Sequence, residues 1–211
     1  VKGGNFMTKE KLRVKNITVN FEEKSIIEDV TITLNEGEIV SILGVSGVGK
    51  TTLFNVIAGL INPCIGTVEL DGENIIGKSG KISYMLQKDL LFPFKTILDN
   101  VSLPLILKGE NKKKAREIAG KYFSQFGLEG MENKYPKELS GGMRQRAAFL
   151  RTYMFSSEIA LLDEPFSALD TITKQKIHTW YLDVVEKLNI SILFITHDID
   201  EAILISDRIY I

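Results

Sequence analysis

The chain has 211 residues, 44% of them hydrophobic and 25% charged, and its formal net charge at pH 7 is −1. A chain of this size and composition is long enough to bury a core and is typical of one compact globular domain. The nearly balanced charge gives no electrostatic reason to expect a nucleic acid as partner.

The sequence gives no sign of a membrane span or an export signal. No uncharged apolar run reaches the roughly 18 to 20 residues that a bilayer span needs, and the start, VKGGNFMTKEK, lacks the apolar stretch of a signal peptide. Met7 is a candidate for the natural first residue, which makes residues 1–6 a tag or extension. Cys64 is the only cysteine, so an internal disulfide is excluded and a reducing cytosol is compatible. We expect Cys64 to be a small packed residue after Pro63, and any work at a membrane to require a partner.

The strand signals predict an α/β fold. The stretches LRVKNITVNF and SIIEDVTITL alternate apolar and polar residues, which indicates half-buried antiparallel strands near the start. Three later stretches, EIVSILG, EIALLDEP and NISILFITH, are short and continuously apolar, as in strands buried on both faces of a parallel sheet. We expect helices over residues 49–60, 112–126, 141–153 and 173–188. The sequence therefore predicts a mostly parallel sheet wrapped by helices, with an antiparallel β part in front.

A phosphate-binding loop follows the first buried strand. The stretch GVSGVGKTT, Gly44 to Thr52, fits G-x-x-x-x-G-K-[ST] between a predicted strand and a predicted helix. Its glycines let the backbone curl so that N–H groups point at phosphates. Lys50 would bind the β- and γ-phosphates and the Thr51 hydroxyl would ligate Mg²⁺. The residues expected to bind ATP here are Gly44, Ser46, Gly47, Gly49, Lys50, Thr51 and Thr52.

The middle of the chain differs in character. From Leu90 to about Tyr135 the pattern is helical, and it suggests a helical lobe inserted between two core strands. Breaks are expected at Pro93, Pro104, Gly109 and Gly127. The triplet Lys112–Lys114 predicts a solvated helix face rather than a binding patch.

The strand in EIALLDEP predicts further residues that act on the nucleotide. Asp163 and Glu164 lie at its carboxyl end, where ligands bind in open α/β sheets. Asp163 is the expected Mg²⁺ partner, through a water, and Glu164 the base that orients or deprotonates a water. The alternative is an ordinary exposed Asp-Glu-Pro turn.

A second anion-binding turn lies in LSGGMRQR, residues 139–146. A Ser-Gly-Gly turn that opens a helix offers unpaired N–H donors and the positive end of the helix dipole. With G-x-x-x-x-G-K-[ST] at 44–51, LSGG at 139–142 and the acidic strand at 159–163, in this order, the chain resembles the ATP-binding cassette (ABC) ATPases from about residue 12 to residue 211.

This resemblance implies a P-loop NTPase (RecA-like) core with a mostly parallel sheet, an N-terminal antiparallel β subdomain and an inserted α-helical subdomain. The chain would be a single ABC ATPase domain. Its nucleotide-binding core would comprise about residues 12–86 and 155–211, and its helical signature lobe about residues 87–154. Such cassettes usually continue beyond the position of Ile211, so we expect the sequence to be truncated at this end.

The resemblance also assigns a role to the second turn. In the family two cassettes pair head to tail, and the signature of one caps the γ-phosphate held by the P-loop of the other. Ser140, Gly141 and Gly142 would therefore act in trans on the neighbour's ATP. Ser167 and Asp170, in SALD, match the D-loop that crosses the dimer interface.

Three further positions fit the same template. Gln87, in ISYMLQKD, matches the glutamine that senses Mg²⁺ and the attacking water, and His197, in FITHD, matches the switch histidine that contacts the γ-phosphate. Phe21 occupies the place of the aromatic residue that stacks on adenine, where the family more often has tyrosine; a core phenylalanine is the alternative. The other histidine, His178, lies in a predicted helix, and we expect it at the surface.

Within the family the chain is most similar to importer ATPases of the nitrate, sulfonate and taurine type. The stretches that carry this likeness are LSGGMRQRAAFLRTYM, LLDEPFSALD, WYLDVV with Trp180, ITHDIDEAILISDRIYI and QKDLLFPFKTILDNV, although that group commonly has Pro-Trp at Pro93-Phe94. The likeness implies ATP and Mg²⁺ as cofactors and a cytoplasmic place, peripheral on the inner face of the cell membrane. The implied partners are a second copy, transmembrane permease subunits and, indirectly, a solute-binding protein, with no nucleic acid. An exporter-type or a non-transport ABC ATPase is the alternative.

The residues after Gln87 form an apolar cluster, Leu90 to Phe94. Two interpretations are open. The cluster is either part of the buried core or a groove that receives a short helix of a membrane subunit, since exposed apolar patches usually mark partner sites.

Overall fold

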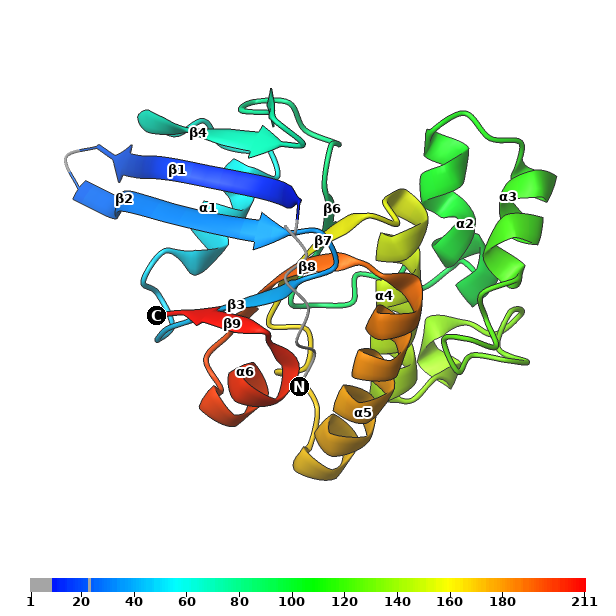
Figure 1. Cartoon of the computed structure of the whole chain (residues 1–211). Coiled ribbons are helices and arrows are strands. Elements are labelled where there is room, and N and C mark those ends of the chain that lie inside the picture. The colour runs from blue at the N-terminus through cyan, green and yellow to red at the C-terminus, as the bar shows by residue number, and fades with distance from the viewer. Residues whose placement is uncertain (1–8, 23) are drawn as a thin grey trace. The chain divides into compact units, whose positions relative to one another are not determined.

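A computed structural model describes residues 9–22 and 24–211 (Figure 1). The expected tag or extension at residues 1–6 and the candidate first residue Met7 lie outside these described residues. The chain packs into two compact units. The first unit consists of the described residues up to Lys81 together with Asn189–Ile211, and the second unit of Ile82–Leu188. Among the described residues, no helix has both the length and the apolar character that crossing a bilayer requires.

The first unit contains the predicted antiparallel sheet, drawn in blue to cyan in Figure 1. Its strands are β1 (Glu10–Phe21), β2 (Lys24–Asn35), β4 (Ile65–Leu70) and β5 (Glu73–Asn74), in the order β2-β1-β4-β5. All neighbouring pairs are antiparallel. Four apolar side chains of β1 are buried, namely Leu12, Val14, Ile17 and Val19, whereas Phe21 at the end of the strand is exposed. The N-terminal antiparallel β part is therefore confirmed.

The first unit also contains three parallel strands. The strand β3 (Ile39–Leu43) lies between β8 (Ser191–Thr196) and β9 (Arg208–Tyr210). Every residue of β8 and four of the five residues of β3 are buried, which explains their continuously apolar sequences. The helices of this unit are α1 (Lys50–Ile57) and α6 (Ile199–Ile205).

The second unit combines a parallel strand pair with helices. The strands are β6 (Ser83–Met85) and β7 (Ile159–Asp163), and the helices are α2 (Ile97–Leu107), α3 (Lys112–Gly120), the 3₁₀ helix Pro136–Glu138, α4 (Gly141–Phe155) and α5 (Thr171–Leu188). Helix α2 packs against both α3 and α4 (Figure 1). This unit holds a cluster of aromatic rings in mutual contact, with centroids 5.3 to 6.2 Å apart: Phe126, Phe149, Tyr153, Trp180 and Tyr181.

Two predictions about the helical region are wrong. The break expected at Pro104 is absent, because α2 continues through it: a proline removes only its own N–H donor, and the Pro104 ring is buried in the packing. The helix expected over residues 112–126 ends at Gly120, where backbone N–H groups begin to bond three residues back, from Lys121 to Ile118.

Two predictions about exposure are also wrong. His178, expected at the surface, is only 6% exposed and its ring lies edge-on to Phe166, with centroids 5.0 Å apart. It belongs to the inner stripe of α5, at helical spacing from the buried Tyr181. Cys64, expected to be packed, is exposed, although its backbone N–H is tied to the carbonyl of Thr18 at 2.8 Å.

Candidate functional site

The phosphate loop of the first unit has the curled backbone that its sequence predicts. Strand β3 ends at Leu43 and α1 begins at Lys50. Between them Gly47 and Gly49 have φ angles of 86° and 100°, in the left-handed region that disfavours side chains. A Cβ on Gly49 would lie only 2.9 Å from the carbonyl oxygen of Ile26. Glycine is therefore required at this position by both conformation and space.

The loop presents hydrogen-bond donors and a cation. Gly49, at the N-terminal end of α1, has no side chain to cap the helix, so first-turn amides can point at a ligand. The Lys50 side chain lies along the loop, and its Nζ donates to the carbonyls of Gly44 and Val45 at 2.7 and 2.8 Å. The Ser46 and Thr51 residues are exposed. Backbone amides at a helix start beside a lysine are an arrangement suited to an anion, and two hydroxyl-bearing residues of the loop are exposed.

His197 leaves the parallel strands at the same edge as the phosphate loop. Leu43 at the end of β3 is paired with Thr196 at the end of β8, and His197 follows directly, exposed. The turn is fixed by its neighbours: the Asp198 N–H donates to Thr196 Oγ1 at 3.0 Å, and the Asp198 side chain caps α6. The predicted switch histidine is therefore close in the strand register to the loop that precedes Lys50.

Phe21 lies at the hairpin end of β1 and is 51% exposed. The alternative of a core phenylalanine is wrong. Phe21 pairs with Lys24 across the hairpin, two residues before Ile26, the residue that Gly49 approaches. The hairpin therefore brings an accessible aromatic ring to the side of the first unit that carries the phosphate loop.

The second unit gathers the predicted acidic and amide residues at the ends of its two strands. Met85 is paired with Leu162, so Gln87 and Glu164 follow side by side. Gln87 Nε2 lies 3.3 Å from both Glu164 Oε2 and Ser167 Oγ. Ser167 also donates to the Glu164 carbonyl at 2.9 Å. Glu164 has a φ of 45°, a strained left-handed conformation of the kind that concentrates at functional sites.

Asp163 has a partner that the sequence did not reveal. Asp163 is only 5% exposed, and the Tyr84 hydroxyl donates to its Oδ2 at 3.3 Å. Burial, and then the nearby carboxylate, raise the pKa of Tyr84. The sequence signal for this contact was Tyr84 itself, a residue with a hydroxyl group in the short strand β6, three residues before Gln87.

The signature turn opens α4 as expected. Ser140 is the N-cap, and its Oγ accepts a hydrogen bond from the Met143 N–H at 3.3 Å. A Cβ on Gly141 or Gly142 would lie 3.2 Å from side-chain atoms of Leu169 and Thr173, respectively. The two glycines therefore allow a close approach between this turn and the segment that contains SALD.

Asp170, the second predicted D-loop residue, holds the start of α5. Its carboxylate accepts from the Thr173 hydroxyl at 2.6 Å and from the Thr173 N–H at 3.1 Å. These hydrogen bonds lower the pKa of Asp170. Ser167 and Asp170 thus lie between the acidic strand end and the signature turn, inside one unit.

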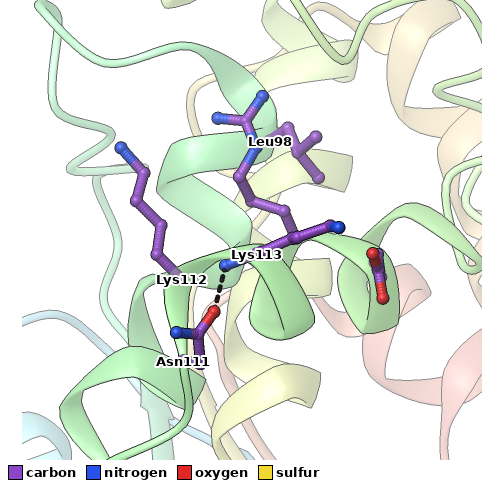
Figure 2. Close-up of a pocket in the computed structure, with 6 residues that line it drawn as sticks. Leu98, Asn111, Lys112 and Lys113 are labelled. Carbon is purple, nitrogen blue, oxygen red and sulfur yellow. Dashed lines mark hydrogen bonds between the residues drawn. The ribbon is translucent and has the colours of Figure 1, made fainter.

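A separate open hollow of about 740 Å³ lies on the second unit (Figure 2). It is lined by Leu98, Asn111, Lys112, Lys113, Arg116 and Glu117. Figure 2 shows the Asn111 side chain turned toward the backbone N–H of Lys113, which caps α3, and Arg116 is paired with Asp99 at 2.5 Å. The Lys112 side chain is 70% exposed, as a solvated helix face predicts. None of the predicted nucleotide-site residues lines this hollow.

Comparison with known proteins identifies the family to which the chain belongs. A family model described as ABC transporter matches residues 27–167, two thirds of the chain. The chain belongs to the ABC transporter family. It is an ATP-binding subunit of this family, an ATPase whose activity is coupled to transport. The family, the P-loop NTPase fold and the ATPase activity expected from the sequence are therefore confirmed.

Individual relatives refine the comparison. The formylaminopyrimidine import ATP-binding protein ThiZ of Halalkalibacterium halodurans is 48% identical over 97% of this chain and 80% of its own length. The nitrate import ATP-binding protein NrtD of Synechocystis is 38% identical over 88% of this chain and 70% of its length. A bacterial ABC transporter cassette solved as a dimer superimposes with a TM-score of 0.79 at 32% identity, covering 94% of this chain and 92% of that one.

Proposed function

We propose that this ABC ATPase drives an importer of a small anion or organic solute and works as a head-to-tail pair of cassettes. The observation that carries the proposal is the presence of two built anion-binding turns in one chain. One is the phosphate loop before α1, and the other is the Ser140–Gly142 turn before α4. In a head-to-tail pair, the Ser140–Gly142 turn of each chain contacts the ATP held by the phosphate loop of the other chain, so both turns have a function. The dimeric cassette among the structural relatives agrees with such a pair.

The first unit supplies the residues that hold the triphosphate. The loop amides and Lys50 neutralise the β- and γ-phosphates, and the exposed Phe21 stacks on adenine. His197 contacts the γ-phosphate from the adjoining turn. Lys50 exchanges its present hydrogen bonds to the carbonyls of Gly44 and Val45 for phosphate oxygens.

Magnesium is the metal that the donor types fit. Thr51 offers an exposed hydroxyl, Asp163 a carboxylate and Gln87 a side-chain amide, all of them the oxygen donors that Mg²⁺ prefers when it also binds phosphates. When bound, Mg²⁺ neutralises charge on the β- and γ-phosphates. The Tyr84 hydroxyl fixes the Asp163 carboxylate, so that one oxygen is oriented by the protein.

Glu164 is the proposed base for the attacking water. The Gln87 amide and the Ser167 hydroxyl restrict the rotation of its carboxylate and its backbone. Glu164 accepts the water's proton, and Ser140–Gly142 of the second copy donate N–H groups to the transferring phosphoryl group. Most of the catalysis is positioning and charge neutralisation.

The membrane partner docks on a short apolar segment. We call Asp89–Thr96 the docking segment. Leu90, Phe92 and Phe94 are 53%, 39% and 73% exposed, whereas Leu91 alone is buried, at 7%. Pro93 is exposed as well, so the core interpretation is wrong for four of the five residues of the cluster. We assign this surface to a short helix of the transmembrane permease, which places the ATPase peripherally on the inner face of the membrane, with a solute-binding protein delivering the cargo.

Mixing two inactive variants tests the shared catalytic pocket. Lys50→Ala removes the phosphate-loop cation. Ser140→Asp keeps a good helix N-cap and places a negative charge against the neighbour's γ-phosphate. Each variant alone should be inactive in an ATPase assay. Because half of the mixed dimers are heterodimers with one intact pocket of two, the mixture should recover about a quarter of wild-type activity. A mixture no more active than its components contradicts the head-to-tail pair.

A further inference from the structure

The turn that begins the docking segment is strained. Leu90 has a φ of 44°, a left-handed conformation that a branched apolar residue rarely adopts. Its side chain is exposed, so core packing does not enforce the conformation. Strain of this kind persists only where surrounding contacts hold it. The relevant contacts are therefore those made to the backbone on either side of Leu90.

Arg151 of helix α4 makes these contacts. Its two terminal nitrogens donate to consecutive carbonyls, Nη1 to Leu90 at 2.8 Å and Nη2 to Asp89 at 2.6 Å. Burial lowers the pKa of Arg151, and the Asp89 charge opposes this effect. A partly buried guanidinium whose fork fits two adjacent carbonyls holds the backbone in one geometry.

Arg144, two turns earlier on the same helix, contacts the same turn. Its Nε lies 3.3 Å from Asp89 Oδ2, and its Nη1 donates to the Leu139 carbonyl at 2.8 Å. Leu139 directly precedes the signature residue Ser140. The other Asp89 carboxylate oxygen, Oδ1, accepts from the Leu91 N–H at 3.1 Å. Asp89 is thereby tied both to its own turn and to the signature turn.

We propose that Arg144 and Arg151, the arginine clamp, are positioning residues that make the docking segment move with the signature helix α4. The inference rests on the proposed docking and signature roles. Through these hydrogen bonds the clamp joins the turn that contacts the second copy's ATP to the turn that contacts the membrane partner. When the signature turn caps the second copy's ATP and α4 is displaced, Leu90 and Phe94 move with it.

Distances between spin labels within one chain test the clamp. In a Cys64→Ser background, labels are placed at Phe94→Cys in the docking segment and at Ser157→Cys just beyond α4, both exposed positions. The labelled protein is diluted with unlabelled chain, and pulsed electron resonance is recorded without nucleotide and with ATP plus EDTA. With the clamp intact, one narrow distance should be found in both states. In Arg151→Gln a second, populated distance should appear as Leu90 relaxes.

Arg146→Gln is the matched control, because Arg146 is on the same helix but stacks over Trp180, 4.7 Å from the ring centroid. It should keep the single distance. Arg151→Lys, which retains the charge but not the fork, should populate the second distance less than Arg151→Gln does.

Asp89→Ala provides a second test should Arg151→Gln fail to fold. A single unchanged distance in both Arg151→Gln and Asp89→Ala, or an ATP-dependent shift with the clamp intact, overturns the proposal. The nucleotide-free comparison involves neither hydrolysis nor pairing, so its failure is distinct from failure of the proposed function.

Discussion

The side-chain amide of Gln87 lies 3.3 Å from a carboxylate oxygen of Glu164, although the two residues are 77 positions apart in the chain. The contact follows from the parallel pairing of β6 with β7, which brings the residues beyond each strand to one edge. It orients the carboxylate that we assign as the base for hydrolysis. Substitutions at this site should therefore have specific effects on ATP turnover.

Replacing Glu164 by glutamine should preserve the shape of the site and remove its basic oxygen. We expect ATP to bind but turnover to fall by about 10²- to 10⁴-fold, the usual contribution of a positioned general base. The variant should accumulate as an ATP-dependent dimer in light scattering. Glu186→Gln, at an exposed position on α5, is the control. Wild-type turnover in Glu164→Gln would refute the assignment.

Lys50→Ala should weaken nucleotide binding. Charge-assisted hydrogen bonds to phosphate are worth about 1.5 to 3 kcal/mol, so the affinity should fall at least about tenfold in a calorimetric titration. Lys78→Ala, which removes a surface partner of Glu73, should bind ATP like the wild type. Equal affinities for both variants would show that Lys50 does not touch the phosphates.

Asn100→Ala should destabilise the fold. The Asn100 side chain is fully buried and makes four hydrogen bonds with the docking-segment backbone, at 2.7 to 3.2 Å. Its loss leaves several backbone groups without partners, and we expect the free energy of unfolding in urea to fall by about 2 to 4 kcal/mol. Asn111→Ala, which removes only the cap of α3, should cost about 1 kcal/mol. Similar small losses for both would contradict this role.

Phe94→Asp should release the transmembrane partner while ATP binding persists. Phe94 is 73% exposed, so a charge at this position should leave the fold intact. The measurement is a pull-down of a transmembrane permease produced together with this chain. Leu107→Asp is a matched control, because Leu107 is 78% exposed but lies at the end of α2, outside the docking segment. Retention of the permease by Phe94→Asp would remove the docking assignment.

Acid should weaken the first unit partly through Asp71. The hydrogen bond from Lys11, at 2.8 Å, lowers the pKa of the Asp71 carboxyl. Because the folded pKa is depressed, the stabilisation is present above the unfolded value of about 3.9 and is lost as the pH falls through the folded pKa. With the side chain 36% exposed and screened by solvent, Asp71→Asn should cost only about 0.5 to 1 kcal/mol at pH 7. Urea unfolding should show this difference vanish in strong acid.

The sequence was sufficient to predict the features that depend on neighbouring residues. The phosphate loop, the buried acidic strand and the Ser140 cap each depend on neighbouring residues, and the structure has each of them in the predicted element. Helix bounds were less accurate where packing overrides local preference, as at Pro104. His178 was misassigned because a polar side chain can be buried against a ring such as Phe166.

Contacts between distant residues could not be predicted. The Tyr84–Asp163 hydrogen bond depends on the register of β6 against β7, which one sequence does not specify. Arg151 reaches Leu90 across 61 positions, and neither residue type nor spacing reveals the pair. A non-glycine residue in the left-handed region, such as Leu90, is likewise visible only in the folded backbone.

During synthesis, β3, the strand that precedes the phosphate loop, is made long before the strands with which it pairs. Both neighbours of β3, the strands β8 and β9, lie about 150 residues or more further along the chain. While the ribosome is producing the whole second unit, Ile39–Leu43 is an apolar strand without either of its final neighbours. Such delayed pairing is slow and invites aggregation. A nascent chain halted before residue 191 should therefore need a chaperone to stay dispersed.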